Sequence, residues 1–217
     1  MTPKPLDTRA DAWLATLDAH LASRLRFLLA ADKLKTVLRG SRIADGSRRE
    51  NTAEHSWHIA LFALVLAPHA AEPVDPLRVV SMLLIHDLVE IECGDTPLFD
   101  AAAAASQAAR EREAADRLYG LLPAADAALY RALWDEFEAA ETPDARFAKA
   151  VDRLQPILLN HAVAGGTWTD YGVDEARERS LTRRIADGSP ALWAAAEAAI
   201  GDAVRNGWLR SAGPVAA

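Results

Sequence analysis

The sequence has little cysteine and no long hydrophobic run, and both absences restrict the kind of protein it encodes. A single cysteine, Cys93, excludes an internal disulfide framework, and the lack of further thiolates argues against a structural zinc site. No window approaches the ~18 uninterrupted apolar residues of a membrane-spanning helix, and residues 1–10 lack the hydrophobic core of a secretory signal. We therefore expect a cytoplasmic protein with no membrane partner.

The net charge excludes another class of partner. The chain carries 31 acidic and 24 basic residues, for a net charge of −7. Domains that bind nucleic-acid polymers usually present a basic face, so a polymer is not expected here. A small anionic molecule remains a possible partner if a metal ion or a local group of basic residues meets it.

The composition favours helix almost everywhere. Alanine is abundant, and β-branched residues are scattered rather than clustered in alternating runs. We find no linker rich in proline, glycine or serine and no internal repeat. The sequence therefore predicts an all-α, single-domain helical bundle over residues 1–217, with a core at about 20–207 and a frayed tail from Ser211.

Helix boundaries are marked by local signals. Asn51 followed by Glu54 is typical of a capping box, and Asp75, Thr142 and Ser189 each precede a proline at the first helical position. Pro156 is expected to kink its helix, and residues 40–46 are expected to form a loop. The predicted helical regions are 11–39 (one or two helices), 51–68, 76–92, 101–120, 123–140, 143–164 and 190–207.

The segment 78–92 contains the main functional signal. Nine of its 15 residues are apolar, which favours a buried helix, yet His86, Asp87 and Glu90 lie among them. A buried carboxylate is normally paired, protonated or bound to a metal. Because Glu90 follows Asp87 by three residues and His86 by four, the three side chains are expected to point toward one side of the helix.

Other polar residues have two possible interpretations when each is considered alone. His55 could be a hydrogen-bonded core histidine or a ligand. Asp95 could be a turn aspartate bound to its own backbone, or it could fold back over the cluster near Glu90. Asp152, in an apolar helix just before Pro156, could cap a local group or bind a metal. The basic residues between 35 and 49 could form a solvated edge or contact an anion.

The order of these residues resembles that of a known family. His55, the pair His86-Asp87 and Asp152, each on its own predicted helix, resemble the metal site of HD-domain metal-dependent phosphohydrolases. Three longer stretches, residues 49–58, 86–95 and 147–155, look like the branch that contains the 5′-deoxynucleotidases. The resemblance covers roughly residues 20–200.

The resemblance implies a cofactor and an activity. It implies that a divalent metal is held by His55, His86, Asp87 and Asp152. Two imidazoles and two carboxylates with open positions suit Mn²⁺, Co²⁺ or Fe²⁺, with Mg²⁺ possible. The implied reaction is metal-dependent removal of the 5′-phosphate from (deoxy)nucleoside monophosphates, and the implied assembly is a homodimer.

The resemblance also assigns residues outside the metal set. Glu90 and Asp95 match the family's acidic pair near the reacting phosphate and water. Arg39 corresponds to an arginine proposed to touch the substrate phosphate, whereas Gly40 stands where a bacterial member has tryptophan. His58 is not part of the pattern, and we interpret it as a neighbour of the ligands or a packing residue.

Two alternatives remain open at this level. The protein could be a helical protein that keeps the metal as a staple or senses nucleotides without cleaving them, although a staple would not need Glu90 and Asp95. It could instead be a phosphohydrolase that acts on another phosphomonoester or on a cyclic nucleotide. Base and sugar preference and the native metal are left undetermined.

Overall fold

The computed structural model describes residues 12–95 and 101–212, and helices make up most of them. The protein is all-α, and the strands among the described residues form one two-stranded antiparallel sheet. In chain order the elements are α2 (Ala19–Ala31), η1 (Asp32–Thr36), β1 (Leu38–Arg42), β2 (Arg49–Asn51), α3 (Thr52–Leu66), η2 (Ala67–His69), α4 (Pro76–Ile85), η3 (His86–Val89), α5 (Glu90–Cys93), α6 (Ala101–Tyr119), α7 (Ala124–Ala139), α8 (Pro143–Ala162), α9 (Thr167–Asp170), α10 (Glu175–Thr182), α11 (Ile185–Gly188) and α12 (Pro190–Arg205).

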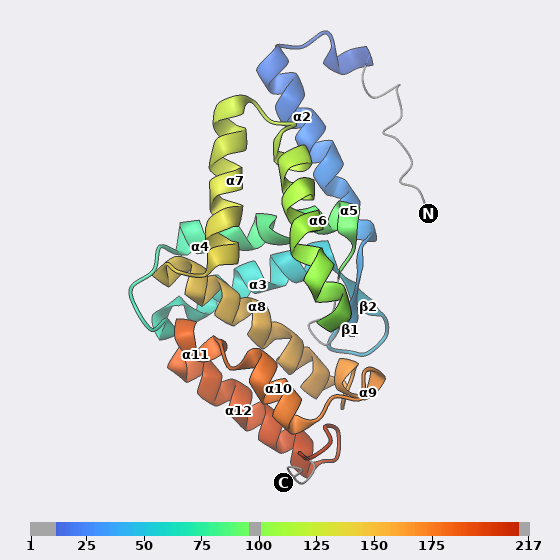
Figure 1. Ribbon diagram of the computed structural model, residues 1–217, viewed down its shortest axis with the longest axis vertical. Helices are drawn as coiled ribbons and strands as arrows, with labels where there is room; N and C mark the ends of the chain where they lie inside the picture. Colours follow the sequence, from blue (N-terminus) through green and yellow to red (C-terminus); the bar gives the residue numbers. More distant parts are fainter. Residues whose placement is uncertain (1–11, 96–100, 213–217) are drawn as a thin grey trace.

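Helix α8 is the element around which the others are arranged. It crosses the middle of the molecule, with α6 and α7 on one side and α10, α11 and α12 on the other (Figure 1). It packs against α3, α4, α7, α11, α12 and β1. Its buried apolar side chains, such as Val151 and Leu154, therefore form the centre of the core. Asp152 lies between these two residues, which places a carboxylate at the centre of the fold.

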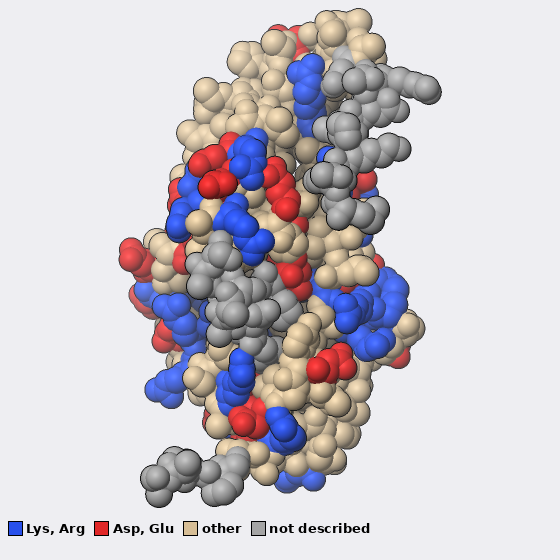
Figure 2. Space-filling view, turned by 45° about the vertical axis from the view of Figure 1, so that its right-hand side comes forward, with Lys and Arg blue, Asp and Glu red and all other residues tan. Residues whose placement is uncertain are grey.

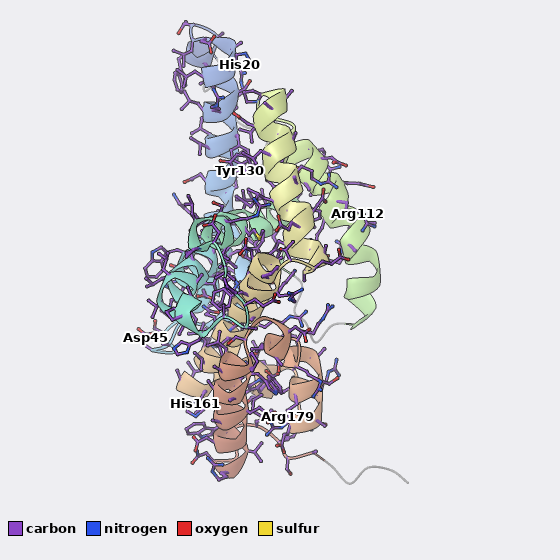
Figure 3. All side chains as sticks on the ribbon, turned by 90° about the vertical axis from the view of Figure 1, so that its left-hand side faces the viewer. His20, Asp45, Arg112, Tyr130, His161 and Arg179 are labelled. Carbon is purple, nitrogen blue, oxygen red and sulfur yellow. The ribbon has the colours of Figure 1, made fainter. Side chains whose placement is uncertain are left out.

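Aromatic side chains join α2 to α6 and α7 at the N-terminal end of the molecule. Tyr130 of α7 lies against α2 (Figure 3), with its ring centroid 5.9 Å from that of Phe27. The same phenylalanine lies 6.3 Å from Tyr119 of α6. These tilted ring pairs join α2 to α6 and α7.

The predicted helix starts are confirmed. The Asn51 side chain accepts a hydrogen bond from the backbone N–H of Glu54, and the Glu54 carboxylate accepts one from the N–H of Asn51, which completes the capping box. Asp75, Thr142 and Ser189 cap α4, α8 and α12, each followed by proline. Helix starts are encoded locally, so a few neighbouring residues were enough to predict them.

The continuous helix predicted over 78–92 is wrong. Helix α4 ends at Ile85, His86–Val89 form a 3₁₀ turn, and α5 then runs from Glu90 to Cys93. The carbonyl oxygens at the break receive side-chain donors from other helices: the Tyr119 hydroxyl donates to Ile85 (3.0 Å) and the Trp134 indole N–H to His86 (3.1 Å). These donors stabilise the break from α6 and α7, which the local sequence could not indicate.

The loop predicted at 40–46 is also a partial error, because most of it belongs to a hairpin. Strand β1 pairs with β2 in antiparallel register, and Ile43 N–H donates to Arg48 O across the turn (3.1 Å). Asp45 marks the tip of this hairpin, at the edge of the molecule (Figure 3). Glycine, arginine and serine have low strand propensity, so the sequence carried no alternating pattern. The predicted helix over 11–39 accordingly stops before residue 37.

The remaining expectations from the sequence concern Pro156, membrane-spanning helices and the C-terminal tail. Helix α8 continues through Pro156 to Ala162, and the kink expected at this proline stays a prediction. Within the described ranges, no helix is both long enough and apolar enough to cross a membrane. The frayed tail predicted from Ser211 falls mostly outside the described residues, which end at 212.

Candidate functional site

Three segments far apart in sequence bring a polar cluster together inside the core. His55 comes from α3, His86 from η3 and Asp152 from α8. Asp152 Oδ1 lies 3.0 Å from His55 Nε2 and 3.7 Å from His86 Nε2. One ligand atom from each residue lies within 4.8 Å of the others. Both imidazoles are buried, whereas the Asp152 side chain is 21% exposed, so the three groups meet where the core borders the surface.

Asp87 lies at the edge of this trio. Its Oδ1 is 2.9 Å from His86 Nε2, and its Oδ2 is 3.9 Å from His55 Nε2. Arg39 Nη1 lies 3.1 Å from the same Oδ2. Burial opposes ionisation of Asp87, but His86 and Arg39 keep its pKa below the ordinary value. All four predicted ligands thus converge, with Asp87 shared between the histidines and the arginine.

The cluster has the donors and the charge expected of a site that could hold a divalent metal. His86 Nε2 is buried and makes no hydrogen bond within the described part of the chain, although it faces Asp87 and Asp152. Burial lowers the pKa of His86, but these two carboxylates outweigh it and raise the pKa to about 10, so a cation is strongly favoured here. Two imidazoles with two carboxylates and no thiolate are a donor set for a metal of intermediate hardness.

The predicted acidic pair and Arg39 line a pocket of about 190 Å³ together with His86, Asp87 and Asp152. Glu90 is nearly buried, and its Oε2 accepts a hydrogen bond from the Thr52 hydroxyl (3.0 Å). Burial and the negative charge of Asp87 raise the pKa of Glu90 to about 9. Asp95 lies 3.6 Å from Arg39, and burial raises its pKa as well.

Four charged residues of the same pocket were missed by the sequence reasoning. Lys149 and Arg153 line it from α8, and Glu111 and Glu138 line it from α6 and α7. The two basic residues could have been found, since they lie three residues before and one after Asp152 on one helix. The two acidic residues gave no such signal.

The charge of this pocket is unbalanced. Six carboxyl groups line it against Arg39, Lys149, Arg153 and His86, so acidic groups outnumber basic ones even when Glu90 is protonated and His86 is charged. A bound cation would offset this excess and favour a phosphate group. On the face of the molecule shown in Figure 2, Lys and Arg side chains gather at mid-height on the right, so the surface charge is not evenly mixed. A metal ion within the cluster would reverse the local sign and make the pocket attractive to an anion.

Gly40 lies against the segment that contains α9. A Cβ at position 40 would lie 3.2 Å from Thr167 Cγ2 and 3.6 Å from the ring of Tyr171. A large side chain at this position would therefore collide with that segment. The glycine noted in the sequence is explained by this close approach, and the corner beside Arg39 is shaped by residues 167–171.

Two residues near the cluster have packing roles. The Cys93 thiol donates to Val89 O (3.0 Å), and burial raises its pKa to about 11, so it stays protonated at neutral pH. His58 lies outside the pocket, with its Nδ1 3.2 Å from Gln155 Nε2. The position of His58 agrees with its interpretation from the sequence.

Comparison with known proteins identifies relatives of this arrangement. The family model described as HD domain matches residues 31–193. The chain is 31% identical to human 5′-deoxynucleotidase HDDC2 over 146 residues, which cover 66% of this chain and 70% of that protein. It is 32% identical to the bovine protein of the same name over 148 residues, covering 67% and 70%.

Two solved structures are similar to this fold. One, from Magnetospirillum magnetotacticum MS-1, is described as a predicted metal-dependent phosphohydrolase; it is 53% identical, has a TM-score of 0.85, and the match covers 88% of this chain and 96% of that one. A conserved hypothetical protein from Pyrococcus furiosus has a TM-score of 0.51 at 23% identity, covering 68% and 84%, and shares the fold alone.

Proposed function

Because this chain belongs to the HD domain family and is a phosphohydrolase, we propose that it removes the 5′-phosphate from nucleoside monophosphates, deoxynucleotides included. The curated relatives described above carry the name 5′-deoxynucleotidase, at about 30% identity. Identity at this level supports a common reaction type more strongly than a common substrate. The substrate is therefore the part of the proposal that needs a direct test.

The observation that supports the proposal is that a possible metal site and a second pair of carboxyl groups lie side by side. The His55, His86 and Asp152 trio could hold a divalent cation, and Glu90 and Asp95 line the pocket that His86 and Asp152 also line, without belonging to the trio. A site that merely held a structural metal would not need a second pair of carboxylates beside it. Phosphoester hydrolysis needs both a cation and a group that moves a proton.

We propose that Asp87 completes the metal set with the trio. Mn²⁺, Co²⁺ or Fe²⁺ fits two nitrogen and two oxygen donors best, and Mg²⁺ is possible. When bound, the cation would neutralise phosphate charge and lower the pKa of a water molecule. The residues around the metal set would bind the phosphate and handle the proton.

Arg39 is the proposed phosphate-binding residue. Its Nη1 contacts Asp87 and Asp95, while its Nε is buried and makes no hydrogen bond within the described part of the chain. That N–H can donate to a phosphate oxygen, and the planar guanidinium suits such a contact. Glu90 or Asp95 would orient or deprotonate the attacking water, or protonate the leaving 5′ oxygen.

Phosphate release from a panel of substrates tests the proposal. The purified protein is stripped of metal, reloaded in turn with Mn²⁺, Co²⁺, Fe²⁺ and Mg²⁺, and given each deoxynucleoside 5′-monophosphate, AMP, p-nitrophenyl phosphate and cyclic AMP. We expect the highest kcat/KM for 5′-monophosphates with at least one metal.

The same panel identifies the alternatives. Faster cleavage of p-nitrophenyl phosphate or of the cyclic nucleotide would indicate a different phosphoester substrate. Binding of a nucleotide without release of phosphate, whichever metal is present, would indicate a nucleotide sensor instead of an enzyme.

We also propose that the protein is a homodimer that uses the exposed side of α3 and α4. These helices pack against each other and against α8, so their exposed sides point away from α8. No Asp, Glu, Lys or Arg occurs between residues 56 and 66. Four large apolar residues of α3 and two of α4 are 43–74% exposed. We term them the outer α3–α4 face: Trp57, Leu61, Leu64, Val65, Leu77 and Leu84.

The size of this face fits a second copy of the chain. Six large side chains about half exposed amount to ~500 Å² of apolar surface, at the upper end for a monomer and a large share of the ~800 Å² that each partner buries in a stable complex. On α7 and α12, by contrast, Leu133, Phe137 and Leu192 are buried in the core.

A charge introduced into the outer α3–α4 face should separate the dimer. We expect wild type to sediment as a dimer and Leu64→Glu as a monomer, because a two-fold interface places the new carboxylate in the contact twice. Leu129→Glu on α7 is the matched control, since Leu129 is 56% and Leu64 57% exposed. If Leu129→Glu separates the dimer and Leu64→Glu does not, another face forms the interface.

A further inference from the structure

The side chain of Gln155 contacts one nitrogen of the His55 ring, and Asp152 contacts the other. Gln155 is fully buried and comes from α8, three residues after Asp152. Its Oε1 lies 3.1 Å from His55 Nδ1, while Asp152 Oδ1 lies 3.0 Å from Nε2 of the same ring. One helix therefore contacts both nitrogens of this imidazole.

The orientation of the Gln155 amide follows from its other two contacts. Its Nε2 donates to Glu50 Oε1 (2.7 Å) and faces His58 Nδ1 (3.2 Å). Turning the amide over would set its carbonyl oxygen against the Glu50 carboxylate, which is unfavourable in a buried site. The amide oxygen therefore faces His55, and because an amide oxygen only accepts, His55 Nδ1 must be the donor.

The position of this proton determines whether His55 Nε2 faces Asp152 with a lone pair or with an N–H group. With the proton on Nδ1, Nε2 of a neutral ring carries a lone pair that faces the Asp152 carboxylate at 3.0 Å. Two acceptors at this distance repel each other unless a cation lies between them. His86 is arranged in the same way, since its Nδ1 lies 2.8 Å from the backbone carbonyl of Leu83.

We propose that Gln155 is a positioning residue that holds His55 in the tautomer with Nε2 free for a metal ion, and that Glu50 and His58 hold the Gln155 amide in place. The proposal rests on the metal set described above but is independent of which phosphoester the protein cleaves. Glu50 is itself nearly buried, with Oε2 3.7 Å from His55 Nδ1, and burial raises its pKa to about 7. Above that pH, the charge of Glu50 also favours a proton on this nitrogen. Groups that orient a metal-binding histidine typically change metal affinity by about 10–100-fold when removed.

Exchanging donor and acceptor between positions 50 and 155 tests this role. At pH 8, Gln155→Glu sets two carboxylates against each other, and we expect the Kd for Mn²⁺ to rise about 10–100-fold. In Gln155→Glu with Glu50→Gln, the new amide at position 50 donates to the new carboxylate at 155, whose other oxygen still accepts from His55. We expect this double variant to recover most of the affinity, as measured by calorimetric titration of metal-free protein.

Gln155→Leu removes the amide altogether and should weaken Mn²⁺ binding by a similar factor. The thermal unfolding midpoint (Tm) of each metal-free protein shows whether a substitution weakens the fold. We expect the double variant to have the wild-type Tm, so a change in its metal affinity would not be caused by unfolding. If Gln155→Leu does not fold, the comparison of Gln155→Glu with the double variant still decides the question. Wild-type affinity in Gln155→Glu, or no recovery in the double variant, would overturn the proposal.

The titration also distinguishes this inference from the proposed function. If wild type binds no Mn²⁺, Co²⁺ or Mg²⁺ at all, the metal set is wrong and the role of Gln155 is overturned with it. If wild type binds metal and the exchange behaves as expected while no nucleotide is hydrolysed, the positioning role stands and the substrate assignment fails.

Discussion

Asp152→Asn should yield a folded protein that no longer retains a divalent metal and that releases phosphate about 10³-fold more slowly. The Asp152 carboxylate is the group that faces both imidazoles, at 3.0 and 3.7 Å. Asparagine preserves the shape and one oxygen but removes the negative charge, so the buried site loses much of its attraction for a cation. Metal content after dialysis, measured by mass spectrometry, and phosphate release together check the result.

A carboxylate–imidazole pair outside the pocket provides the control for this experiment. Asp202 lies 2.9 Å from His161 Nε2, close to the separation of Asp152 from His55. His161 lies near α12, in the part of the molecule farthest from α2 (Figure 3). Asp202→Asn should therefore keep both metal and turnover. Retention of a full equivalent of metal by Asp152→Asn would remove Asp152 from the ligand set.

Glu90→Gln should bind metal like wild type and lose about 10²–10⁴-fold in kcat, the usual contribution of a group that moves a proton. Glutamine can still accept the hydrogen bond from Thr52, so the local packing at this buried position is preserved. What the substitution removes is the ability to accept or deliver a proton within the pocket. Steady-state hydrolysis of dAMP and metal content measured on the same sample check both parts.

Glu111→Gln is the matched control for Glu90→Gln. Glu111 lines the same pocket, and burial raises its pKa too, but its carboxylate accepts a hydrogen bond from Gln107 (2.9 Å) and has no proposed role in proton transfer. We expect Glu111→Gln to change kcat only slightly. Turnover of dAMP by Glu90→Gln at the wild-type rate would show that Glu90 does not take part in the reaction.

The two experiments separate binding of the metal from transfer of the proton. Loss of metal with loss of turnover is expected for Asp152, and loss of turnover alone for Glu90. If both variants lost metal, Glu90 would belong to the ligand set and Asp95 would be the remaining candidate for proton transfer. The structure allows this comparison because Glu90 lines the pocket without belonging to the trio of His55, His86 and Asp152.

Predictions based on neighbouring residues were accurate in this chain. The capping box at Asn51 and the capped prolines after Asp75, Thr142 and Ser189 all mark helix starts in the structure. Each of these signals depends on hydrogen bonds between residues that are close in sequence.

Predictions failed where distant residues supply the hydrogen bonds. The break after Ile85 depends on donors from Tyr119 and Trp134, and the hairpin at 38–51 depends on strand pairing between residues of low strand propensity. In the site, Glu50 and Gln155 lie within the motif-like stretches 49–58 and 147–155, but nothing in the sequence indicated a role for either. They lie 105 residues apart and are joined by a single hydrogen bond.

By itself, the sequence determined the all-α class, most helix boundaries and the identity of the polar residues placed in apolar segments. Local propensity, capping and the cost of burying charge are properties of short stretches, so they can be recognised without coordinates. Only the tertiary structure decided that His55 and Asp152, 97 residues apart, face each other at 3.0 Å, and which nitrogen of His55 faces that carboxylate. Such contacts are made when helices pack side by side, and that packing depends on the whole core.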